Sequence, residues 1–413
     1  TSDKPHYENV PFEVPSSWVW TTVGDIAESN IGLTYKPSDI CDDGVPVYRS
    51  NNIQNRRIDK TELVRVNAKI LDKQYLAVGD LLICARNGSR RLVGKCALIE
   101  NLSEPSAFGA FMAVCRSAYN PWIYLLLNTG YFNRYLDDSN STAINQVTQS
   151  MLLAFRVPFP PKKEQDRIIY EISKWFDLID TIEKSKEEMQ VIISTTKSKI
   201  LDLAIHGKLV PQDPTDEPAS ELLKRINPKA EIISDNGHYQ KLPEGWCLTT
   251  LGSIGLWQSG ATPSRLQKEY YGGNIPWLKT GDLNDGIIIN IPEFITEKAL
   301  AETSVKLNPS GSVLIAMYGA TIGKVGILSF PATTNQACCA CVDYKLEQMY
   351  LFYFLLANRE NFIRMGGGGA QPNISKEKII NTVISLPPLK EQHRIVAKIE
   401  EIFAQLDAIE ASL

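Results

Sequence analysis

Apolar residues recur with alternating steps of four and three along two stretches of the chain. From Ile168 they fall at positions 168, 172, 175, 179 and 182, and the series resumes at 189, 193, 200 and 203. From Ile395 the same stepping runs to Leu413. Such spacing places apolar side chains in one seam along a helix, as in a coiled coil. The predicted seam residues are Ile168, Ile172, Trp175, Ile179, Ile182, Ile395, Ile399, Ile402, Leu406 and Ile409.

Nearly the same motif opens both periodic stretches. "PPKKEQDRIIYEI" begins at Pro160 and "PPLKEQHRIVAKI" begins at Pro387, an offset of 227 residues (387 − 160). Proline is tolerated in the first turn of a helix and stops the element before it. We therefore predict a first helix over about residues 162–205 and a second from 386 to 413. Glu, Gln and Arg of the motif are expected to pack the start of each helix.

The rest of the chain is duplicated in the same order. "WVWTTVGDI" (18–26) matches "WCLTTLGSI" (246–254), and "GVPVYRSNNI" (44–53) matches "NIPWLKTGDL" (274–283). Short β-type runs such as "VGDLLICAR" and "GSVLIAMYG" alternate with turns and with a helical stretch over 350–365, so each copy is predicted to be an α+β domain. The predicted layout is a first domain (1–157), a helix (158–206), a linker with a short helix (207–240), a second domain (241–385) and a last helix (386–413).

Composition narrows the class of protein. Of 413 residues, 44% are apolar and 22% are charged, and no apolar run reaches the ~18 residues that a membrane span needs. No apolar signal core opens the sequence, so we expect a cytoplasmic protein with reduced thiols and no metal site. The net charge of −4 gives no overall basic footprint for nucleic acid, so any such footprint must be local.

Catalytic motifs are not found. "GATIGKV" (319–325) has three residues between its glycines and Val after Lys, whereas a phosphate-binding loop needs four and then Ser or Thr. We read it as a strand–turn–strand glycine. We also find no methyltransferase signature and no trusted nuclease cluster. The sequence therefore predicts a chain that is not itself an enzyme.

Binding chemistry is concentrated in a few loops that differ between the two copies. Arg suits guanine edges and phosphate, and Asn or Gln suits adenine edges, so the mixture fits major-groove readout. Solvated loops with an ordinary Arg content remain the alternative. The candidates in the first domain are Tyr35, Lys36, Arg49, Asn51, Asn52, Arg56, Arg57, Arg86, Asn87, Arg90, Arg91 and Lys95. Those in the second domain are Thr262, Ser264, Arg265, Lys268, Tyr271, Lys279, Thr280, Tyr318, Thr321 and Lys324.

Taken together, these motifs resemble the specificity subunit of type I restriction-modification systems. The resemblance rests on the doubled "P-P-x-x-E-Q-x-R-I", on "HGKLVPQDPTDEPASELL" after the first helix, on "LPEGW…TTLG" and on "GGAQPNIS". It implies two tandem α/β target recognition domains, each reading one half of a gapped DNA site, and long helices that pair as an antiparallel coiled coil.

The resemblance also implies partners. Two methyltransferase subunits would dock on this chain, and restriction/translocase subunits would join the full complex. S-adenosylmethionine, ATP and Mg would be bound by those subunits and not by this chain. The other hypothesis that the sequence leaves open is a non-catalytic scaffold whose domains and coiled coil bind protein partners.

Overall fold

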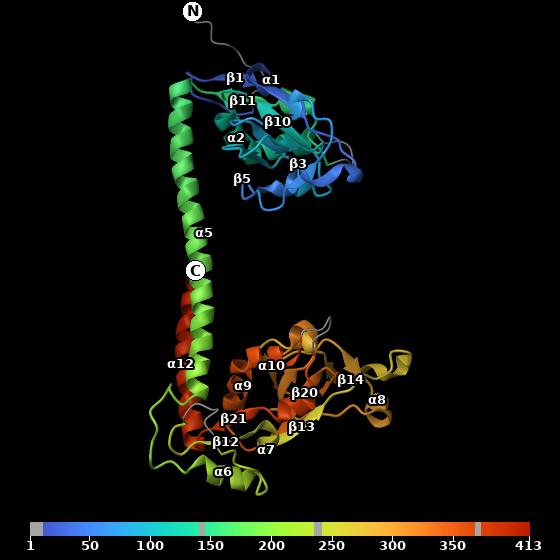
Figure 1. Ribbon diagram of the computed structural model, residues 1–413, viewed down its shortest axis with the longest axis vertical. Coiled ribbons are helices and arrows are strands. Elements are labelled where there is room, and N and C mark those ends of the chain that lie inside the picture. Colours follow the sequence, from blue (N-terminus) through green and yellow to red (C-terminus); the bar gives the residue numbers. More distant parts are fainter. Residues whose placement is uncertain (1–10, 140–144, 235–241, 368–372) are drawn as a thin grey trace, which may run out of the picture. The chain divides into compact units, whose positions relative to one another are not determined.

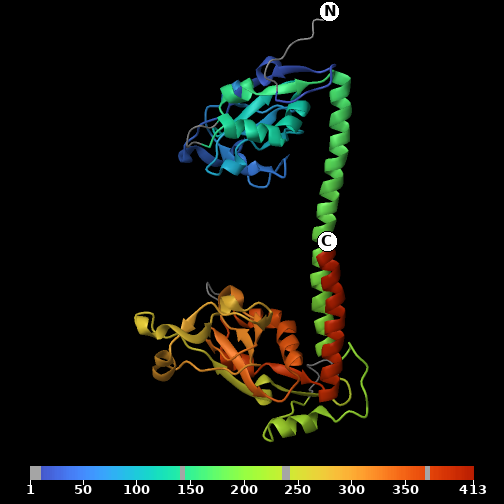
Figure 2. The same cartoon turned by 180° about the vertical axis from the view of Figure 1, so that it is seen from behind.

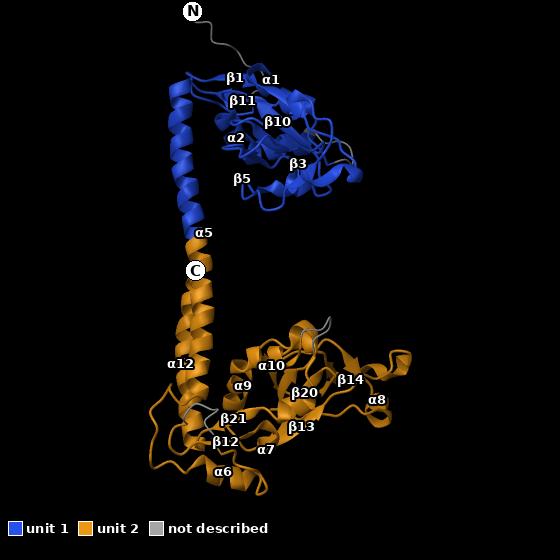
Figure 3. Cartoon of the chain, in the orientation of Figure 1, with its two compact units in different colours: residues 1–182 blue, residues 183–413 orange. Residues whose placement is uncertain are grey.

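The structure is a computed structural model that describes residues 11–139, 145–234, 242–367 and 373–413. The beginning of the first predicted domain, the end of the predicted linker and all of "GGAQP" (368–372) lie outside these residues. The chain forms two compact units, residues 1–182 and 183–413, which Figure 3 colours separately. Their boundary falls inside one helix, α5 (Lys162–Ile205), and the predicted domain limits stay a prediction.

The described residues of the first unit form three small sheets and a hairpin, together with several helices. A four-stranded antiparallel sheet has the order β2-β10-β7-β8, a three-stranded sheet has the order β6-β3-β9, and β1 pairs with β11. In the three-stranded sheet, β3 is antiparallel to β6 and parallel to β9. The strands are β1 (Val19–Thr22), β2 (Glu28–Ile31), β3 (Ile40–Tyr48), β4 (Ile53–Gln54), β5 (Arg57–Ile58), β6 (Val64–Val66), β7 (Leu81–Cys84), β8 (Cys96–Leu98), β9 (Ala107–Phe108), β10 (Met112–Arg116) and β11 (Arg156–Phe159).

Helices cover one face of the four-stranded sheet in this unit. Alternate residues of β7 point to opposite faces, so Leu81 and Ile83 pack with the helices while Leu82 and Cys84 enter a second cluster. All four of these side chains are fully buried. The helices of the unit, besides the first part of α5, are α1 (Val23–Ile26), α2 (Asn120–Leu127), α3 (Gly130–Ser139) and α4 (Gln149–Ala154), with 3₁₀ turns η1 (Pro37–Asp39), η2 (Ser50–Asn52), η3 (Asp72–Gln74) and η4 (Arg90–Leu92).

The second unit repeats this topology. Its main sheet has the order β13-β20-β17-β18 with β15 added at the edge, its three-stranded sheet has the order β16-β14-β19, and β12 pairs with β21. As in the first unit, the middle strand β14 is antiparallel to one neighbour and parallel to the other. The strands are β12 (Cys247–Thr250), β13 (Gly255–Ser259), β14 (Tyr271–Leu278), β15 (Gly286–Ile288), β16 (Phe294–Ile295), β17 (Val313–Ala316), β18 (Val325–Leu328), β19 (Thr333–Thr334), β20 (Cys338–Tyr344) and β21 (Val383–Leu386).

The predicted helical stretch over 350–365 is divided into two helices, which meet at Asn358. The side-chain amide of Asn358 turns back to donate to the Phe354 carbonyl, and the backbone leaves helical geometry there. "GATIGKV" is a 3₁₀ turn between β17 and β18, as predicted. The helices and turns are α6 (Ala219–Ile226), α7 (Leu251–Ile254), α8 (Glu297–Glu302), α9 (Gln348–Ala357), α10 (Arg359–Met365), α11 (Lys376–Ile380), α12 (Leu389–Ser412), η5 (Lys268–Tyr270), η6 (Thr280–Asp282) and η7 (Gly319–Thr321).

Within the second unit, α12 lies antiparallel to the last part of α5 (Figures 1 and 2). The Lys186 ammonium donates to the Leu413 carbonyl at 2.6 Å, and Lys197 pairs with Glu410 at 3.2 Å. Apolar side chains lie between the two helices. On α12, Ile395 and Ile399 are fully buried, whereas Ile402 and Leu406 are half-buried and Ile409 is 46% exposed.

The first part of α5 has the same seam, but its side chains are open to solvent. Ile168 and Ile172 are half-buried, and Trp175, Ile179 and Ile182 are 63%, 42% and 58% exposed. No described residue covers the last three, because α12 reaches back along α5 only as far as Lys186. The seam role of these three residues therefore stays a prediction.

The doubled motif forms the same junction twice. Gln165 and Gln392 are fully buried, and each side-chain amide donates to the carbonyl of the first proline of its motif, Pro160 at 2.8 Å and Pro387 at 2.9 Å. In the second copy Glu391 accepts from Trp246, and Arg394 pairs with Asp216 at 2.7 Å. These contacts lock the start of α12 onto its domain, which is the packing role expected from the sequence.

Candidate nucleic-acid interface

Two polar loops of the first unit lie side by side. The loop after β3 holds Arg49 and Asn51, and the loop after β7 holds Asn87. The Asn87 amide donates to the Ser50 hydroxyl at 3.3 Å and so joins the two loops. Both loops follow strands whose last residues are buried, Val47 and Tyr48 in β3 and Ile83 and Cys84 in β7, and this burial fixes where the loops leave the sheets. Folding thus brings together two groups of candidates that lie almost forty residues apart in sequence.

Some of the predicted residues support these loops from inside. The Asn52 side chain is 1% exposed; it accepts from the Arg49 amide and donates to the carbonyls of Asp59 and Glu62. Lys95 donates to the Ile53 carbonyl at 2.9 Å, and burial lowers the pKa of its ammonium. Both side chains therefore hold the loop backbone, and neither extends into solvent.

The arginines of the loop after β7 differ in how firmly they are held. Arg90 pairs with Asp137 on α3, and the Arg86 guanidinium lies 5.7 Å from the centre of the Phe111 ring. Arg91 is exposed, and no described residue bonds to its side chain. Arg91 is therefore the arginine of this loop that is most available to a ligand. Outside it, Lys36 and Asn51 are also exposed, and Tyr35 and Arg49 are half-buried.

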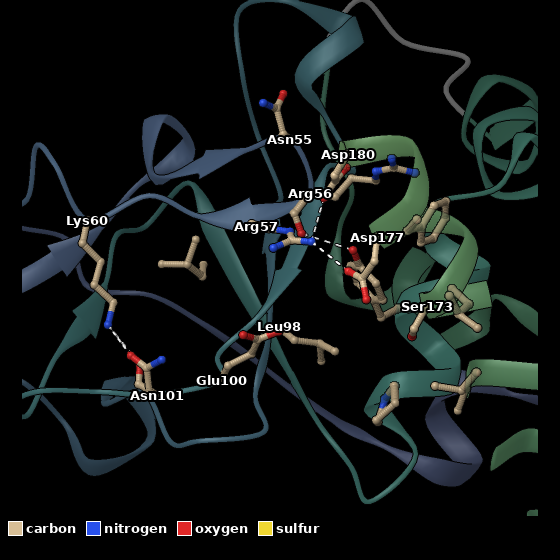
Figure 4. Close-up of a pocket in the computed structure, with 16 residues that line it drawn as sticks. Asn55, Arg56, Arg57, Lys60, Leu98, Glu100, Asn101, Ser173, Asp177 and Asp180 are labelled. Carbon is tan, nitrogen blue, oxygen red and sulfur yellow. Dashed lines mark hydrogen bonds and ion pairs between the residues drawn. The ribbon is translucent and has the colours of Figure 1, made fainter. Parts of the chain in front are cut away.

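Arg56 and Arg57 face α5. They lie in a cleft of about 470 Å³ whose other wall is formed by Ser173, Phe176, Asp177 and Asp180 of that helix (Figure 4). Arg57 forms ion pairs with Asp177 at 3.3 Å and with Asp180 at 2.7 Å. The Arg56 guanidinium stacks 4.2 Å from the centre of the Phe176 ring. The sequence predicted both arginines as DNA-binding residues, and that role stays a prediction; the structure adds that they contact a helix of their own unit.

In the second unit the strongest cluster is built around Glu293. This carboxylate pairs with Arg265 and with Lys279 at 2.8 Å, and the Arg265 hydrogen bond, followed by that of Lys279, lowers the pKa of Glu293. The Arg265 guanidinium also stacks 4.2 Å from the Tyr271 ring centre. A rigid, half-exposed guanidinium on an aromatic platform can stack on a base or bind a phosphate.

The other candidates of the second unit lie in the loops around this cluster and after β17. Thr262 is bonded to Gln336, the Tyr271 hydroxyl donates to the Pro263 carbonyl, and the Thr321 hydroxyl donates to the Tyr318 carbonyl at 2.8 Å. Tyr318 is 42% exposed. Ser264 and Lys268 are exposed, while Thr280, Thr321 and Lys324 are half-buried.

Three residues beside these loops were missed in the sequence. Phe111 is 61% exposed under Arg86, Asn145 donates to the Gly88 carbonyl at 3.2 Å, and Gln336 accepts from Thr262. The amide-rich runs "AINQVTQS" and "TTNQA" were the available signal. The structure brings Asn145 and Gln336 to the polar loops because the chain returns there after α3, where Gln146 forms a β-bridge with Arg86, and again after β19.

No group of three or more His, Cys, Asp or Glu side chains is placed to hold a metal among the residues that the structure describes. Likewise, no helix in the described ranges is long and apolar enough to cross a membrane. Burial raises the pKa of the Cys96 and Cys115 thiols to about 12, which disfavours thiolate chemistry there.

Two copies of one α/β fold, each with its own polar loops and each followed by a helix, define a two-part recognition protein. Residues 15–191 and 243–413 match the family described as type I restriction modification DNA specificity domain. The chain is 25% identical over 421 residues to the type I restriction enzyme EcoKI specificity subunit of Escherichia coli strain K12, covering 96% of this chain and 84% of that protein.

Solved structures share the fold. A chain described under "Structural basis underlying complex assembly and conformational transition of the type I R-M system" aligns with a TM-score of 0.69 at 19% identity, covering 97% of this chain and 94% of that one. The HsdS subunit from Thermoanaerobacter tengcongensis aligns with a TM-score of 0.55 at 19% identity, covering 97% and 93%. The protein belongs to the family of type I restriction-modification specificity subunits.

Proposed function

We propose that this chain selects the DNA target of a type I restriction-modification complex by reading two half-sites separated by a gap. Each domain binds one half-site in the major groove through its polar loops. The paired helices set the length of the gap. Family membership favours this function over a scaffold that binds proteins alone.

One observation carries the proposal: the two units share a framework but differ in the loops. β3 and β14 have the same pairing pattern, and the turns that follow them are capped alike. The Arg49 amide donates to Asn52 at 2.9 Å, and the Lys279 amide donates to Asp282 at 2.8 Å. A shared scaffold with different loop side chains is what two readers of different sequences require.

The chemistry is assigned to partner subunits. Specificity subunits of this family assemble with modification and restriction subunits, and the present chain would dock two modification subunits through its helices. The exposed apolar seam of α5 at Trp175, Ile179 and Ile182 is a candidate for such docking. S-adenosylmethionine, ATP and Mg would be bound by these partners, so the chain itself would be non-catalytic.

Selection from random duplex DNA tests the proposal. The chain is reconstituted with its modification subunits and used to enrich bound duplexes, with the modification subunits alone as the control. We expect one split motif with a fixed gap, and binding that weakens steeply with salt because phosphate contacts release counterions. If no gapped motif is enriched although the complex assembles, the scaffold function replaces this one.

A further inference from the structure

The hairpin formed by β4 and β5 is attached to the helix that follows its domain. Gln54 pairs with Arg57 across the hairpin, so Asn55 and Arg56 are its two turn residues. Both have positive φ, 47° and 63°. A turn of this kind favours Asn followed by Gly, and an arginine in the second position adopts a backbone conformation that is uncommon for its type.

The unusual turn aims two cationic side chains at one face of α5. Figure 4 shows Arg57 between the carboxylates of Asp177 and Asp180, with dashed lines to both. Its neighbour Arg56 lies over the Phe176 ring, and the Tyr124 hydroxyl donates to the Arg56 carbonyl at 3.2 Å. Four contacts therefore hold one short hairpin, and three of them reach the same helix.

The second copy lacks this arrangement at the same positions. With the offset of 230 that aligns Gly44 with Asn274, Arg56 corresponds to Gly286 and Arg57 to Ile287. There, Asp285 has φ of 59° and pairs with Arg359 of α10, which belongs to the domain and not to a long helix. Asp285 lines a cleft with Phe403 and Asp407 of α12, the equivalents of Phe176 and Asp180. Among the described residues, however, a direct bond from this turn to a long helix is found in the first copy alone.

We propose that Arg56 and Arg57 are positioning residues that latch the first recognition domain to α5. They fix the angle between the domain and the helix and thereby the gap at which the first half-site is read. This inference rests on the proposed function. It assigns the two arginines to gap length, in contrast to Arg91, which is exposed and remains a candidate for the bases themselves.

The contacts of the latch predict its behaviour. The Arg57 side chain is 66% exposed, and Asp177 and Asp180 are 74% and 42% exposed. Ion pairs that are this exposed are weakened by salt, and each one contributes little free energy. A guanidinium that is shared by two carboxylates and supported by a stacked neighbour instead acts as a network. Loss of Arg57 should therefore loosen the domain without unfolding it.

The test compares gap preference with base preference. Complexes carrying Arg57→Asp, Asp180→Arg or both are used to select duplexes from a library in which half-site bases and gap length vary. We expect each single variant to raise the share of targets with a gap one base pair too long or too short by roughly fivefold. Base preference at the first half-site should be unchanged. The double variant should restore the narrow distribution of gap lengths, because exchanging the two charges again places a guanidinium between two carboxylates.

A matched control separates the latch from a DNA contact. Arg91→Ala should reduce base preference at the first half-site and leave the distribution of gap lengths unchanged. If Arg57→Asp behaves like Arg91→Ala, or if it changes neither property, the latch is wrong. If the unsubstituted complex enriches no gapped motif, the proposed function has failed, and the latch is then judged by the chain alone.

The chain alone gives the second readout. Spin labels at Lys73→Cys and Lys174→Cys, in a Cys41→Ser background, report the distance between the domain and α5. Both labelled side chains are exposed, and every cysteine other than Cys41 is buried. We expect the distance distribution to broaden in Arg57→Asp and to narrow again in the double variant. An unchanged distribution in Arg57→Asp would overturn the latch whatever the DNA result.

Discussion

The buried glutamines of the doubled motif show at the residue scale how one side chain fixes the start of a helix. Gln392 uses both ends of its amide: it donates to the Pro387 carbonyl and accepts from the Glu347 amide at 3.0 Å. Gln165 donates in the same way, but no described residue donates to its side-chain oxygen. The two positions are therefore equivalent in sequence and unequal in bonding.

This difference predicts unequal losses on substitution with leucine. Gln392→Leu leaves the half-buried Glu347 amide and the buried Pro387 carbonyl unpaired and should lower the free energy of unfolding by roughly 2–4 kcal/mol. Gln165→Leu leaves only the Pro160 carbonyl unpaired and should cost roughly 1–2 kcal/mol. Urea unfolding followed by circular dichroism measures both. Equal losses would mean that the Glu347 contact contributes nothing.

Glu391 gives the second unit a predicted pH dependence. Burial raises the pKa of its carboxyl above the ordinary 4.5, against the opposing hydrogen bonds from Gln212 and Trp246. The folded state therefore holds this proton to higher pH than the unfolded state, so the contribution is complete below about pH 4.5 and is lost as pH rises through the folded pKa.

Glu391→Gln should remove the part of the pH dependence of stability that Glu391 contributes. Unfolding midpoints in urea measured between pH 4 and pH 8 should fall less with rising pH in the variant than in the unsubstituted chain. Glu164→Gln is the matched control, because Glu164 is the equivalent residue at the half-exposed start of α5. Parallel pH profiles for Glu391→Gln and the unsubstituted chain would show that Glu391 does not carry this linkage.

The limits of sequence reasoning are also visible at this scale. The packing role of Gln165 and Gln392 could be predicted because the motif, its prolines and the helix start are adjacent in the chain. The orientation of Arg56 and Arg57 could not, because the partners Phe176, Asp177 and Asp180 lie some 120 residues away. Charge and residue type alone placed these arginines at a DNA surface. The two predictions differ in how far apart in the sequence the contacting residues lie, and not in the chemistry of the residues.

At the scale of elements, periodicity predicted the helices well but not what covers them. α5 spans Lys162–Ile205, as the seam and the prolines indicated. Each seam residue of α12 is less exposed than its equivalent on the first part of α5, since only the last part of α5 faces a partner helix within the described residues. A heptad pattern predicts which face of a helix makes contacts. It does not predict which helix or subunit covers that face, because this depends on the assembly.

A matched pair of seam residues tests this interpretation. Ile399 and Ile172 are equivalent at the offset of 227, and Ile399 is fully buried whereas Ile172 is half-buried. Ile399→Ala should cost about 2–4 kcal/mol in the free energy of unfolding, and Ile172→Ala should cost less than about 1 kcal/mol. Adding the modification subunit should raise the cost at Ile172 if that subunit covers the seam. An equally large loss at Ile172 in the free chain would instead show that its seam is already covered.

At the scale of the whole molecule, the sequence duplication predicted that the two units share a fold, which the amino-acid identities between the copies do not by themselves suggest. The sheet orders β2-β10-β7-β8 and β13-β20-β17-β18 repeat, as do the mixed three-stranded sheets. The duplication could not predict how the β4–β5 hairpin differs from the equivalent segment of the second unit. There, Arg-Arg replaces Gly-Ile, and the turn is attached to α5 in place of the added strand β15. The two copies can therefore be coupled to their helices in different ways.

The proposed spacing role of the helices leads to a prediction for the complete complex. A seven-residue insertion after Lys184 adds two helical turns, about 10.5 Å, and keeps the seam on nearly the same face. At about 3.4 Å per base pair, the added length corresponds to roughly three base pairs, so the selected target should have a longer gap with both half-sites unchanged. A two-residue insertion at the same place is the control, because it rotates the following helix by about 200° and should abolish binding without lengthening the gap. Selection from a library of variable gaps measures both variants. An unchanged gap in the seven-residue variant would show that the distance between the half-sites is set by a partner subunit and not by α5.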